Sequence, residues 1–374
     1  MKKKILICFG TRPEAIKMCA LVHSLKQTDF QVEVCVTAQH REMLDQVLDF
    51  FEITPDYDLN IMKPNQSLNE LSSRIFMKMD EVLTAAVPDL VLVHGDTTTS
   101  SICAWAAFHR GIKVGHVEAG LRTYDKQAPF PEEANRQITG RLADFHFAPT
   151  ETSKDNLISE KVAEDSIIVT GNTVIDSLLW TVAKLEEKFT NEKIEMLQNI
   201  VDLSKRIILV TGHRRENFGD GFLNICKALG NIATNHDVEI VFPVHLNPNV
   251  QEPVMRLLSE YKNIHLIEPL DYPSFVFMMM KSHLIITDSG GVQEEAPSLG
   301  KPVLVMRDTT ERPEAVAAGT VKLVGTDYEK ITSSATELLL DQRIYDQMST
   351  AYNPYGDGHA NERIVNFIKD NLPS

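Results

Sequence analysis

The chain has 374 residues, which is long for one compact core and suits two domains of roughly 150–200 residues each. Its formal net charge of −15 excludes a broadly basic surface, so we expect neither a nucleic-acid nor a membrane partner. No apolar run is long enough to span a membrane, the first residues lack the features of a signal peptide, and the cysteines form no CxxC pair. These features predict a cytoplasmic protein with reduced thiols.

Short β-branched segments alternate with longer amphipathic segments along almost the whole chain. A first series of strands is predicted at residues 5–9, 32–37, 90–94, 113–117 and 145–148, and a second at 206–211, 239–244, 264–267, 284–287 and 303–306. Strand–helix alternation builds right-handed βαβ units, and the apolar run PDLVLVHGD is typical of a strand buried in a parallel sheet. The predicted fold class is therefore α/β, with two Rossmann-like domains that contain parallel sheets.

A polar helical stretch, residues 180–199, contains no predicted strand and follows the first series. We place the domain boundary near Gly171, which gives a first domain at residues 1–170 and a second at residues 171–355. Residues 356–374 form a final amphipathic helix, and the pattern alone does not say which domain it packs on.

Polar clusters follow several of the predicted strands directly: GTRPE, HGD, HVEAG, TGHRRE and DSGG. In open α/β sheets, ligands bind beyond the carboxyl ends of the strands. Each cluster alone could be turn chemistry or helix capping. Their joint placement in both halves predicts a cleft lined from two sides.

The DSGG segment predicts a turn that binds phosphate. Gly290 and Gly291 let backbone N–H groups approach an anion at a helix N-terminus, and the carboxylate of Glu295 could accept the ribose hydroxyls. The alternative is an ordinary turn capped by Asp288 or Ser289. Further anion-binding candidates are Arg214, Arg215 and Arg312.

Two common nucleotide-binding fingerprints are missing from the chain. No GxGxxG motif follows a predicted strand, and no GxxxxGK[ST] motif exists, because Gly300-Lys301 is followed by Pro302. The sequence therefore gives little support to hydride transfer or to P-loop hydrolysis.

Acidic residues gather at the strand ends of the first half. Asp96, Glu118 and Glu132 lie at or just past neighbouring strands, with Glu133 beside the third. Carboxylates crowded in a cleft repel one another, which raises some pKa values toward the range of general acid–base catalysis. His213 could add a titrating group or a cation, whereas Glu132 and Glu133 could also simply favour the first turn of a helix.

A metal site is a weaker hypothesis. The pairs His94/Asp96 and His116/Glu118 have the two-residue spacing of ligands on one strand. No HExxH motif or cysteine set accompanies them, so we predict hydrogen-bonded structural histidines and no metal.

Several segments, read in chain order, carry a resemblance that covers nearly the whole chain: GTRPEAIKM, VHGDTTTS, GHVEAGLRT, PFPEEANRQITGRLAD, VTGNTVID, TGHRRENFG, PVHLNPNV, DSGGVQEEAPSLGKPVLVMRDTTERPEA and NPYGDGHANERIV. The chain strongly resembles the bacterial non-hydrolysing UDP-N-acetylglucosamine 2-epimerases. The resemblance implies the glycosyltransferase-B architecture, with a deep cleft between two domains and a C-terminal helix that crosses back to the first domain. It also implies a homodimer that needs no NAD and no metal cofactor.

The family's reaction interconverts UDP-N-acetylglucosamine (UDP-GlcNAc) and UDP-N-acetylmannosamine (UDP-ManNAc), and so supplies ManNAc for cell-surface polysaccharide. The resemblance implies that the sugar loses its C2 proton and UDP, which gives a 2-acetamidoglucal intermediate, and that UDP then adds back. Carried over by motif, the acid–base set is Asp96, Glu118, Glu132 and His213. Which carboxylate removes the proton and which returns it stays open.

The resemblance also assigns binding positions. Matching substrate-binding residues are Arg12, Lys17, Ser289, Gly290, Gly291, Glu295 and Arg312. A second, regulatory UDP-GlcNAc would match Gln39, Glu42 and His245. Glu42 and Asn65 depart from the glutamine and the basic residue expected in activated relatives.

Four alternative functions fit the sequence less well. A retaining glycosyltransferase shares the architecture but rarely needs three acids and a histidine around the sugar. A hydrolysing epimerase is usually fused to a kinase domain, for which this chain has no room. An epimerase of 2,3-diacetamido uronic acid sugars matches GTRPEAIKM less well, and a non-catalytic sensor would not need Asp96, Glu118 and Glu132 together.

Overall fold

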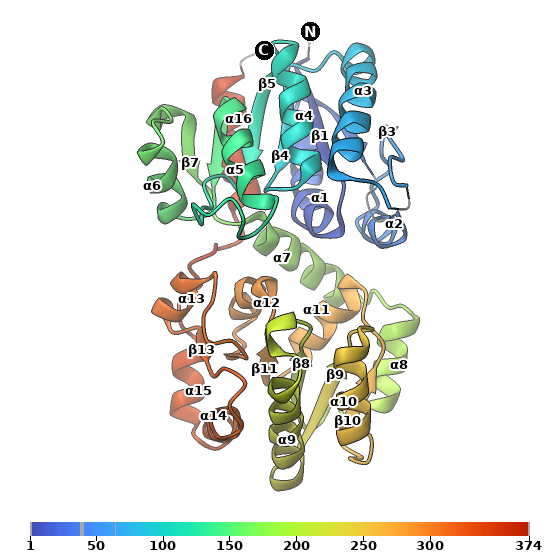
Figure 1. Cartoon of the computed structure of the whole chain (residues 1–374), viewed down its shortest axis with the longest axis vertical. Coiled ribbons are helices and arrows are strands. Elements are labelled where there is room, and N and C mark those ends of the chain that lie inside the picture. The colour runs from blue at the N-terminus through green and yellow to red at the C-terminus, as the bar shows by residue number, and fades with distance from the viewer. Residues whose placement is uncertain (1, 38–40, 64, 373–374) are drawn as a thin grey trace. The chain divides into compact units, whose positions relative to one another are not determined.

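The computed structural model describes residues 2–37, 41–63 and 65–372, and it divides into two compact units (Figure 1). Unit 1 comprises Met1–Ser177 and Tyr355–Ser374, and unit 2 comprises Leu178–Pro354. The first crossing between the units therefore falls after Ser177, whereas the sequence pattern predicts it near Gly171. The difference arises because residues 171–177 stay hydrogen-bonded to unit 1, as in the 2.7 Å bond from Asn172 N to Tyr355 O.

Unit 1 contains a seven-stranded parallel sheet in the order β3-β2-β1-β4-β5-β6-β7. Its strands are β1 (Lys4–Phe9), β2 (Gln31–Val36), β3 (Tyr57–Asp58), β4 (Leu90–His94), β5 (Lys113–Val117), β6 (Phe145–Ala148) and β7 (Ile167–Val169). Its helices are α1 (Arg12–Lys26), α2 (Arg41–Phe50), α3 (Leu68–Ala86), α4 (Thr98–His109), α5 (Glu132–Leu142), α6 (Glu151–Ser159) and α16 (Ala360–Asn371), with the 3₁₀ turn η1 (Glu164–Ser166).

Helices cover both faces of this sheet. α3, α4 and α5 lie side by side on one face, and α1, α2 and α16 cover the other (Figure 1). β4 is buried along its whole length, as its continuous apolar sequence predicts. The C-terminal helix packs on unit 1, where Phe367 forms edge contacts with Phe145 and Phe147 at ring distances of 5.5 and 5.7 Å.

Unit 2 repeats the arrangement with a six-stranded parallel sheet in the order β10-β9-β8-β11-β12-β13. Its strands are β8 (Arg206–Thr211), β9 (Val238–Pro243), β10 (Ile264–Ile267), β11 (Leu284–Thr287), β12 (Val303–Val305) and β13 (Val321–Leu323). Its helices are α8 (Glu192–Ile200), α9 (Asp220–Asn235), α10 (Pro248–Leu258), α11 (Tyr272–Lys281), α12 (Gly290–Glu295), α13 (Pro313–Ala318), α14 (Tyr328–Leu340) and α15 (Gln342–Ser349), with the 3₁₀ turns η2 (Arg215–Asn217) and η3 (Ala296–Leu299). Helix α7 (Thr173–Glu186) begins in unit 1 and ends in unit 2.

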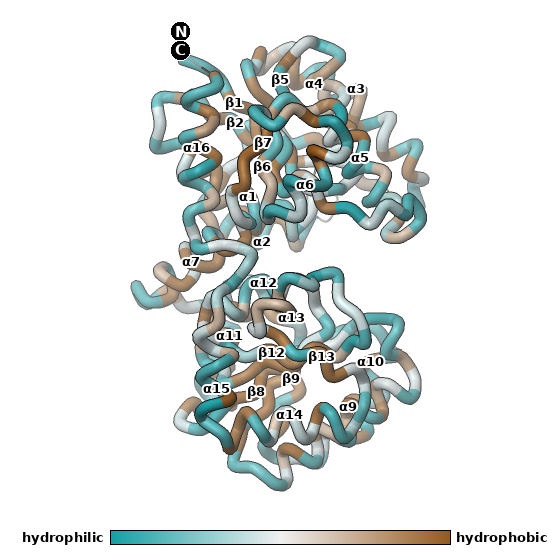
Figure 2. Tube along the Cα trace, turned by 90° about the vertical axis from the view of Figure 1, so that its left-hand side faces the viewer, coloured by the Kyte–Doolittle hydropathy of each residue, from teal (hydrophilic) through white to brown (hydrophobic). Residues whose placement is uncertain are grey.

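The most hydrophobic residues concentrate along the strands of each unit (Figure 2), and buried apolar side chains of the strands and helices form its core. All ten predicted strands are confirmed, six of them with the same bounds. The short outer strands β3, β7 and β13 were not predicted, because two or three residues are too few to show a pattern. The predicted absence of a strand from residues 180–199 is confirmed, since α7 and α8 occupy that stretch.

Both sheets reverse their strand order at one point, between β1 and β4 in unit 1 and between β8 and β11 in unit 2. Ligands of open α/β sheets bind beyond the carboxyl ends of the strands at such a reversal. The polar clusters found in the sequence follow these four strands and β5. Among the described residues, no helix is long and apolar enough to cross a membrane; the cytoplasmic location stays a prediction.

Candidate active site

Glu118 follows β5 and has the most elaborate surroundings of the predicted acids. Its Oε2 accepts a hydrogen bond from Lys17 Nζ, and a second one of 2.8 Å from Asn172 Nδ2. The side chains of Lys17 and Glu118 are 15% and 9% exposed, so this ion pair is largely shielded from water. The arrangement holds a negative charge in a fixed orientation at the carboxyl edge of the sheet.

The backbone of Glu118 is in the left-handed region, with φ of 62°. A non-glycine residue in this conformation costs about 1 kcal/mol or more, and such residues are concentrated at functional sites. The strain is maintained from both sides: Val117 O accepts from Gly95 N, and Ala119 N donates to Phe147 O. The sheet thus forces the carboxylate into a direction that relaxed backbone would not favour.

Asp96 lies beyond β4, next to β5 in the sheet. Its Oδ2 accepts hydrogen bonds from Arg136 Nε and Nη2 at 3.0 and 2.7 Å, and Asn135 Nδ2 donates to its backbone oxygen at 2.9 Å. Asp96 and Glu118 therefore each have a cation as partner. This pairing with cations replaces the uncompensated crowding of carboxylates that the sequence predicts.

Glu132 begins α5 and lines a pocket of about 360 Å³ together with Asp96. The same pocket is lined by Thr11, Thr97 and Asn135. Glu132 is half-buried, and among the described residues none donates a hydrogen bond to its carboxylate. Its side chain therefore has unused acceptor capacity.

Glu133, by contrast, is a structural residue. Its buried carboxylate accepts hydrogen bonds from the backbone N–H groups of Thr123 and Tyr124 at 3.0 and 3.1 Å, and from Gln137 at 2.9 Å. Burial alone would raise the pKa of Glu133, but these hydrogen bonds outweigh it and the pKa lies below the usual range. Its oxygens are occupied in holding the loop before α5.

Helix α1 brings Arg12 and Lys17 to this edge of the sheet. The helix begins with a capping box, in which Thr11 caps the N–H of Glu14 and Glu14 Oε2 accepts from Thr11 N at 2.8 Å. Glu14 also accepts from Thr97 Oγ1 at 2.7 Å, which joins the turns after β1 and β4. Arg12 is half-buried in the first turn of the helix.

Three buried histidines stand on neighbouring strands beneath these acids. Burial lowers the pKa of His94 to about 4, that of His116 to about 3 and that of His146 to about 4, so all three are neutral near pH 7. His94 Nε2 lies 3.7 Å from Glu118 Oε2, and His116 Nε2 is 2.7 Å from Gly95 O. His116 is thus a hydrogen-bonded structural group, as predicted in preference to a metal ligand.

In unit 2, the buried Asp288 follows β11 and organises the turn after β8. Its Oδ2 accepts from the backbone N–H groups of His213 and Arg214 at 2.9 and 2.8 Å, and its Oδ1 lies 3.1 Å from His213 Nδ1. Burial would raise the pKa of Asp288, but the contact with His213 and these backbone bonds lower it. An ionised Asp288 therefore orients the His213 ring, so the alternative of a simple cap by Asp288 is wrong.

The glycine turn that follows has the form the sequence predicts. Ser289 precedes α12 without a side-chain cap, and a Cβ added at Gly290 or Gly291 would meet no protein atom closer than 3.8 Å. Packing therefore does not explain these glycines. Glu295, buried at the end of α12, accepts a 2.9 Å hydrogen bond from Tyr272 Oη.

Two of the predicted arginines of unit 2, Arg312 and Arg214, contact nearby acids. Arg312 Nε donates to Glu294, and Arg214 Nη1 lies 3.6 Å from Glu311. Arg215, the first residue of η2, is exposed. Arg312 Nη2 is the protein atom nearest to a Cβ placed on Gly290, at 4.0 Å, so of the three it is the one beside the glycine turn.

The structure describes two of the three predicted regulatory residues, and these two belong to different units. Gln39 lies outside the described residues, and Glu42 is exposed in the first turn of α2 in unit 1. His245 belongs to unit 2, where its ring stacks on that of His213 with 5.9 Å between centroids. Asn65 is exposed, with φ of 55°.

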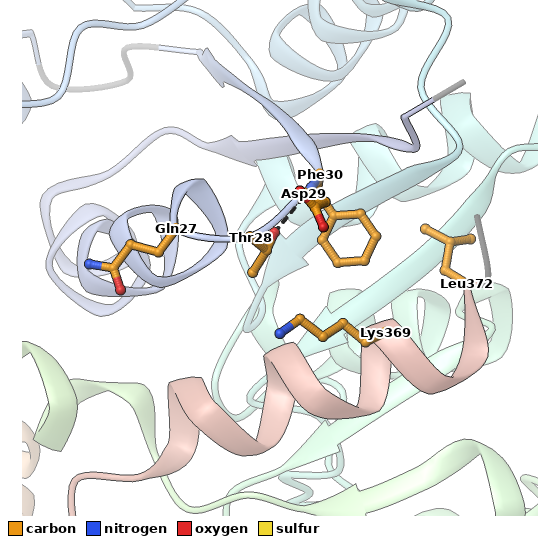
Figure 3. A pocket seen from close by; sticks show the side chains of 6 residues that line it. All are labelled: Gln27, Thr28, Asp29, Phe30, Lys369 and Leu372. Atoms are coloured by element: carbon orange, nitrogen blue, oxygen red, sulfur yellow. Dashed lines mark hydrogen bonds between the residues drawn. The ribbon is translucent and has the colours of Figure 1, made fainter.

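A second pocket of about 360 Å³ lies at the opposite edge of the unit 1 sheet. It is lined by the turn between α1 and β2 and by the end of α16, where Lys369 points toward Thr28 (Figure 3). None of the predicted site residues lines it. Within the described ranges, no three His, Cys, Asp or Glu side chains gather in a way that could hold a metal ion.

The comparison with known proteins decides the family. The sequence pattern described as UDP-N-acetylglucosamine 2-epimerase matches residues 23–369. The chain belongs to this family. The epimerase relative from Escherichia coli K12, named UDP-N-acetylglucosamine 2-epimerase, is 59% identical over 374 residues, which cover 98% of this chain and 99% of the relative.

Solved structures of the epimerase family have the same fold. The UDP-GlcNAc 2-epimerase from Neisseria meningitidis bound to UDP-GlcNAc is 54% identical, with a TM-score of 0.88 over 98% of this chain and all of that one. The putative UDP-N-acetylglucosamine 2-epimerase from Listeria monocytogenes is 49% identical, with a TM-score of 0.92 over 100% of this chain and 97% of that one. The predicted fold class, two parallel-sheet α/β domains of the glycosyltransferase-B type, is confirmed.

Sequence reasoning missed several residues that contact the candidate site residues. They are Asn172, Arg136, Asn135, Tyr272 and Asn217, the last of which donates from Nδ2 to Asp288 Oδ2 at 3.2 Å. Arg136 stands one helical turn after Glu132, so the spacing in PFPEEANRQ could have placed it on the same helix face. Tyr272 is far from Glu295 in the sequence, and no local pattern connects the two.

Proposed function

We propose that this chain interconverts UDP-GlcNAc and UDP-ManNAc by inverting C2 of the sugar, without hydrolysing the substrate. The observation that carries the proposal is Glu118: a strained, shielded carboxylate with Lys17 and Asn172 on one oxygen, beside Asp96 at the carboxyl edge of the sheet. A protein that only bound the nucleotide sugar would not need this costly arrangement.

We assign the nucleotide half of the substrate to unit 2. The glycines of the turn after β11 leave space that no side chain fills, and backbone N–H groups at the start of α12 suit the diphosphate. Glu295, held by Tyr272, is suited to accept hydrogen bonds from the ribose hydroxyls. Ser289, Gly290, Gly291, Glu295 and Arg312 are the residues proposed to bind UDP.

We assign the chemistry at C2 to the acids of unit 1. Inversion needs a proton taken from one face of the ring and another delivered to the opposite face, so one group does not suffice. Asp96, Glu118 and Glu132 provide three carboxylates at one sheet edge. Comparing D96N, E118Q and E132Q, each in both reaction directions, assigns the base and the acid, because each removal should slow proton exchange from one epimer more than from the other.

We further propose an elimination mechanism. A carboxylate takes the C2 proton, the C2–H electrons form a C1–C2 double bond, and the C1–O bond breaks as UDP leaves with its electron pair. The resulting 2-acetamidoglucal regains UDP at C1 and a proton on the other face of C2. Atoms and electrons balance without a cofactor, and Arg12, His213 and the α12 backbone are suited to stabilise the departing diphosphate.

One experiment tests the function. The protein is incubated with UDP-GlcNAc in D₂O without any acceptor, and the sugar is followed by NMR. We expect deuterium at C2 and a mixture of both epimers with the UDP linkage kept. Free sugar with stoichiometric UDP would indicate a hydrolysing epimerase, and a substrate without any deuterium would refute the proposal.

We also propose a homodimer that forms through the outer surface of α3 and α4. Phe76 and Trp105 pack edge to face there with 6.1 Å between rings, and both contact His109. Phe108 on α4 and Met77 on α3 remain 55% and 68% exposed, an apolar surface that a second copy would cover. Sedimentation should give a dimer for the wild type and a monomer for F108E; a monomeric wild type would remove this proposal.

We retain a regulatory role for a second UDP-GlcNAc, with Glu42 and His245 as candidate contacts and Gln39 as a third. The stacking of His245 on His213 supports it, because a ligand that moved His245 would reach His213. Initial rates should then rise more steeply than linearly with UDP-GlcNAc, and less so for H245A. A simple saturation curve for the wild type would remove the regulatory role.

We propose that the product supplies ManNAc for cell-surface polysaccharide.

A further inference from the structure

Two chain segments connect the units, and within unit 1 they are in direct backbone contact. Asn172 N donates to Tyr355 O at 2.7 Å. A Cβ added at Gly171 would lie only 3.2 Å from Gly356 Cα, and both glycines have positive φ, 84° and 144°. Side chains at these two positions would push the segments apart, so the outgoing and returning chain are held together at this point.

The side chain of Asn172 extends from this contact to Glu118. Its Nδ2 donates to Glu118 Oε2 at 2.8 Å, and its Oδ1 accepts from Val174 N at 3.1 Å. Asn172 is 3% exposed. One buried amide therefore joins the carboxylate to the first turn of α7, the helix that runs from unit 1 into unit 2.

The hydrogen bond from Asn172 to Glu118 affects the orientation of the carboxylate because of the oxygen on which it falls. Lys17 Nζ and Asn172 Nδ2 both donate to Oε2, so the amide adds direction to the charge that the lysine supplies. Oε1 lies on the side of the Gly95 turn, 3.7 Å from the place of a Gly95 Cβ. Loss of the amide would remove one of the two hydrogen-bond donors described at Oε2 and loosen the orientation of the carboxylate.

We infer that Asn172 is a positioning residue for Glu118, which ties the orientation of this carboxylate to the paired segments that connect the two units. The inference rests on the proposed role of Glu118 in proton transfer at C2. Displacing these segments would remove the Asn172 donor from Oε2. The competing interpretation is that Asn172 only caps α7.

Two substitutions separate these interpretations, since both keep an acceptor for Val174 N. N172S keeps a good cap but has no group that reaches Glu118. N172D places a carboxylate against Oε2, and two carboxylates at hydrogen-bond distance bind a proton between them, which raises the apparent pKa of the pair. The control is N263A in unit 2, which removes hydrogen bonds of 2.8 and 3.0 Å from Asn263 to Ala233 O and Val238 O.

The readout is the rate of deuterium incorporation at C2 as a function of pH. We expect N172S to lose about tenfold or more in kcat with little change in KM, as when one orienting hydrogen bond of about 1.4 kcal/mol is lost in the transition state. We expect N172D to move the acidic limb of the pH profile upward by about one unit or more. N263A should lower the unfolding midpoint and leave kcat and the profile unchanged.

The outcomes are distinguishable. A wild type without C2 exchange would refute the proposed function itself. A wild type that exchanges, together with folded N172S and N172D variants whose kcat and pH profile match those of N263A, would overturn the role of Asn172 and leave the cap as its only function. If N172D does not fold, N172S with full activity suffices to overturn it.

Discussion

The carboxylate of Asp288 holds His213 at two points. Oδ2 accepts from His213 N at 2.9 Å, and Oδ1 lies 3.1 Å from His213 Nδ1. Because these two atoms lie this close, we expect the proton of the neutral ring on Nδ1, facing the aspartate, which leaves Nε2 for a ligand. Both contacts tie His213 to the strand end that precedes the glycine turn.

Replacing Asp288 with asparagine should disturb the tautomer and the orientation of His213. We expect D288N to lower kcat about 10- to 1000-fold, because the ring would no longer present Nε2 in a fixed direction. Steady-state kinetics with UDP-GlcNAc measures the effect, and circular dichroism checks the fold. A D288N enzyme with kcat within twofold of the wild type would show that Asp288 serves only the backbone of the turn.

The bond from Tyr272 to Glu295 should matter for binding and less for chemistry. Removing the hydroxyl with Y272F leaves Glu295 buried with one donor fewer, so we expect UDP to bind about 5- to 10-fold more weakly, with kcat changed less than threefold. Calorimetry of UDP binding measures this. Y345F is the matched control: it removes a 3.1 Å bond to His283 O elsewhere in unit 2 and should leave UDP affinity unchanged.

A substitution in the glycine turn should change the affinity for UDP without lowering the stability of the fold. A Cβ at Gly291 meets no protein atom within 3.8 Å and φ is not positive, so G291A should fold with an unchanged or slightly higher melting temperature. If phosphate contacts the backbone there, UDP affinity should fall tenfold or more. G120A is the contrast, because φ is +90° and the new Cβ would lie 2.2 Å from Ser153 O. Equal UDP affinity in G291A and the wild type would contradict this binding mode.

The stability of unit 1 should decline as the pH falls from about 6.5 toward 4. His94, His116 and His146 have folded-state pKa values of about 4, 3 and 4, whereas unfolded histidine titrates near 6.5, so the unfolded chain binds more protons in that range. Each histidine changes the free energy of unfolding by up to about 1.4 kcal/mol per pH unit between its folded-state and unfolded-state pKa values. Its stabilising effect is fully present above the unfolded-state pKa of about 6.5. Glu14, whose pKa burial raises above 4.5, acts in the opposite direction between its unfolded and its folded pKa, a range that overlaps that of the histidines.

Tryptophan fluorescence can isolate this effect, because Trp105 lies in unit 1 and Trp180 in unit 2. In a W180F background, urea midpoints at pH 7.0 and 5.5 report on unit 1. We expect a lower midpoint at pH 5.5 and a smaller difference between the two pH values in H146Q. Equal pH dependence with and without His146 would show that this histidine does not titrate below its unfolded value.

The periodic parts of the fold could be predicted, and the tertiary parts of the site could not. Buried strands such as β4 and β5 have apolar runs long enough to recognise, and the polar clusters after them follow from the geometry of parallel sheets. The three short outer strands and the end of the first unit depend on contacts between distant residues, such as that between Asn172 and Tyr355.

The acids illustrate the same limit at the site. Asp96, Glu118 and Glu132 were found from their positions after strands, but their partners were not, because Lys17 and Arg136 are brought to them by helices. The left-handed backbone of Glu118 leaves no mark in the sequence, where this conformation would suggest a glycine. The expectation of mutual repulsion therefore came from charge alone, without the cations that the fold supplies.

The proposal that a proton moves at C2 while UDP departs and returns can be tested in one labelling experiment. UDP-GlcNAc carrying ¹⁸O in the bridge between C1 and the β-phosphate is incubated with the enzyme in D₂O and analysed by ³¹P NMR and mass spectrometry. We expect deuterium at C2 together with movement of ¹⁸O from the bridge into non-bridging positions of the β-phosphate. Deuterium at C2 with all of the ¹⁸O still in the bridge would contradict the elimination, since the C1–O bond would never have broken.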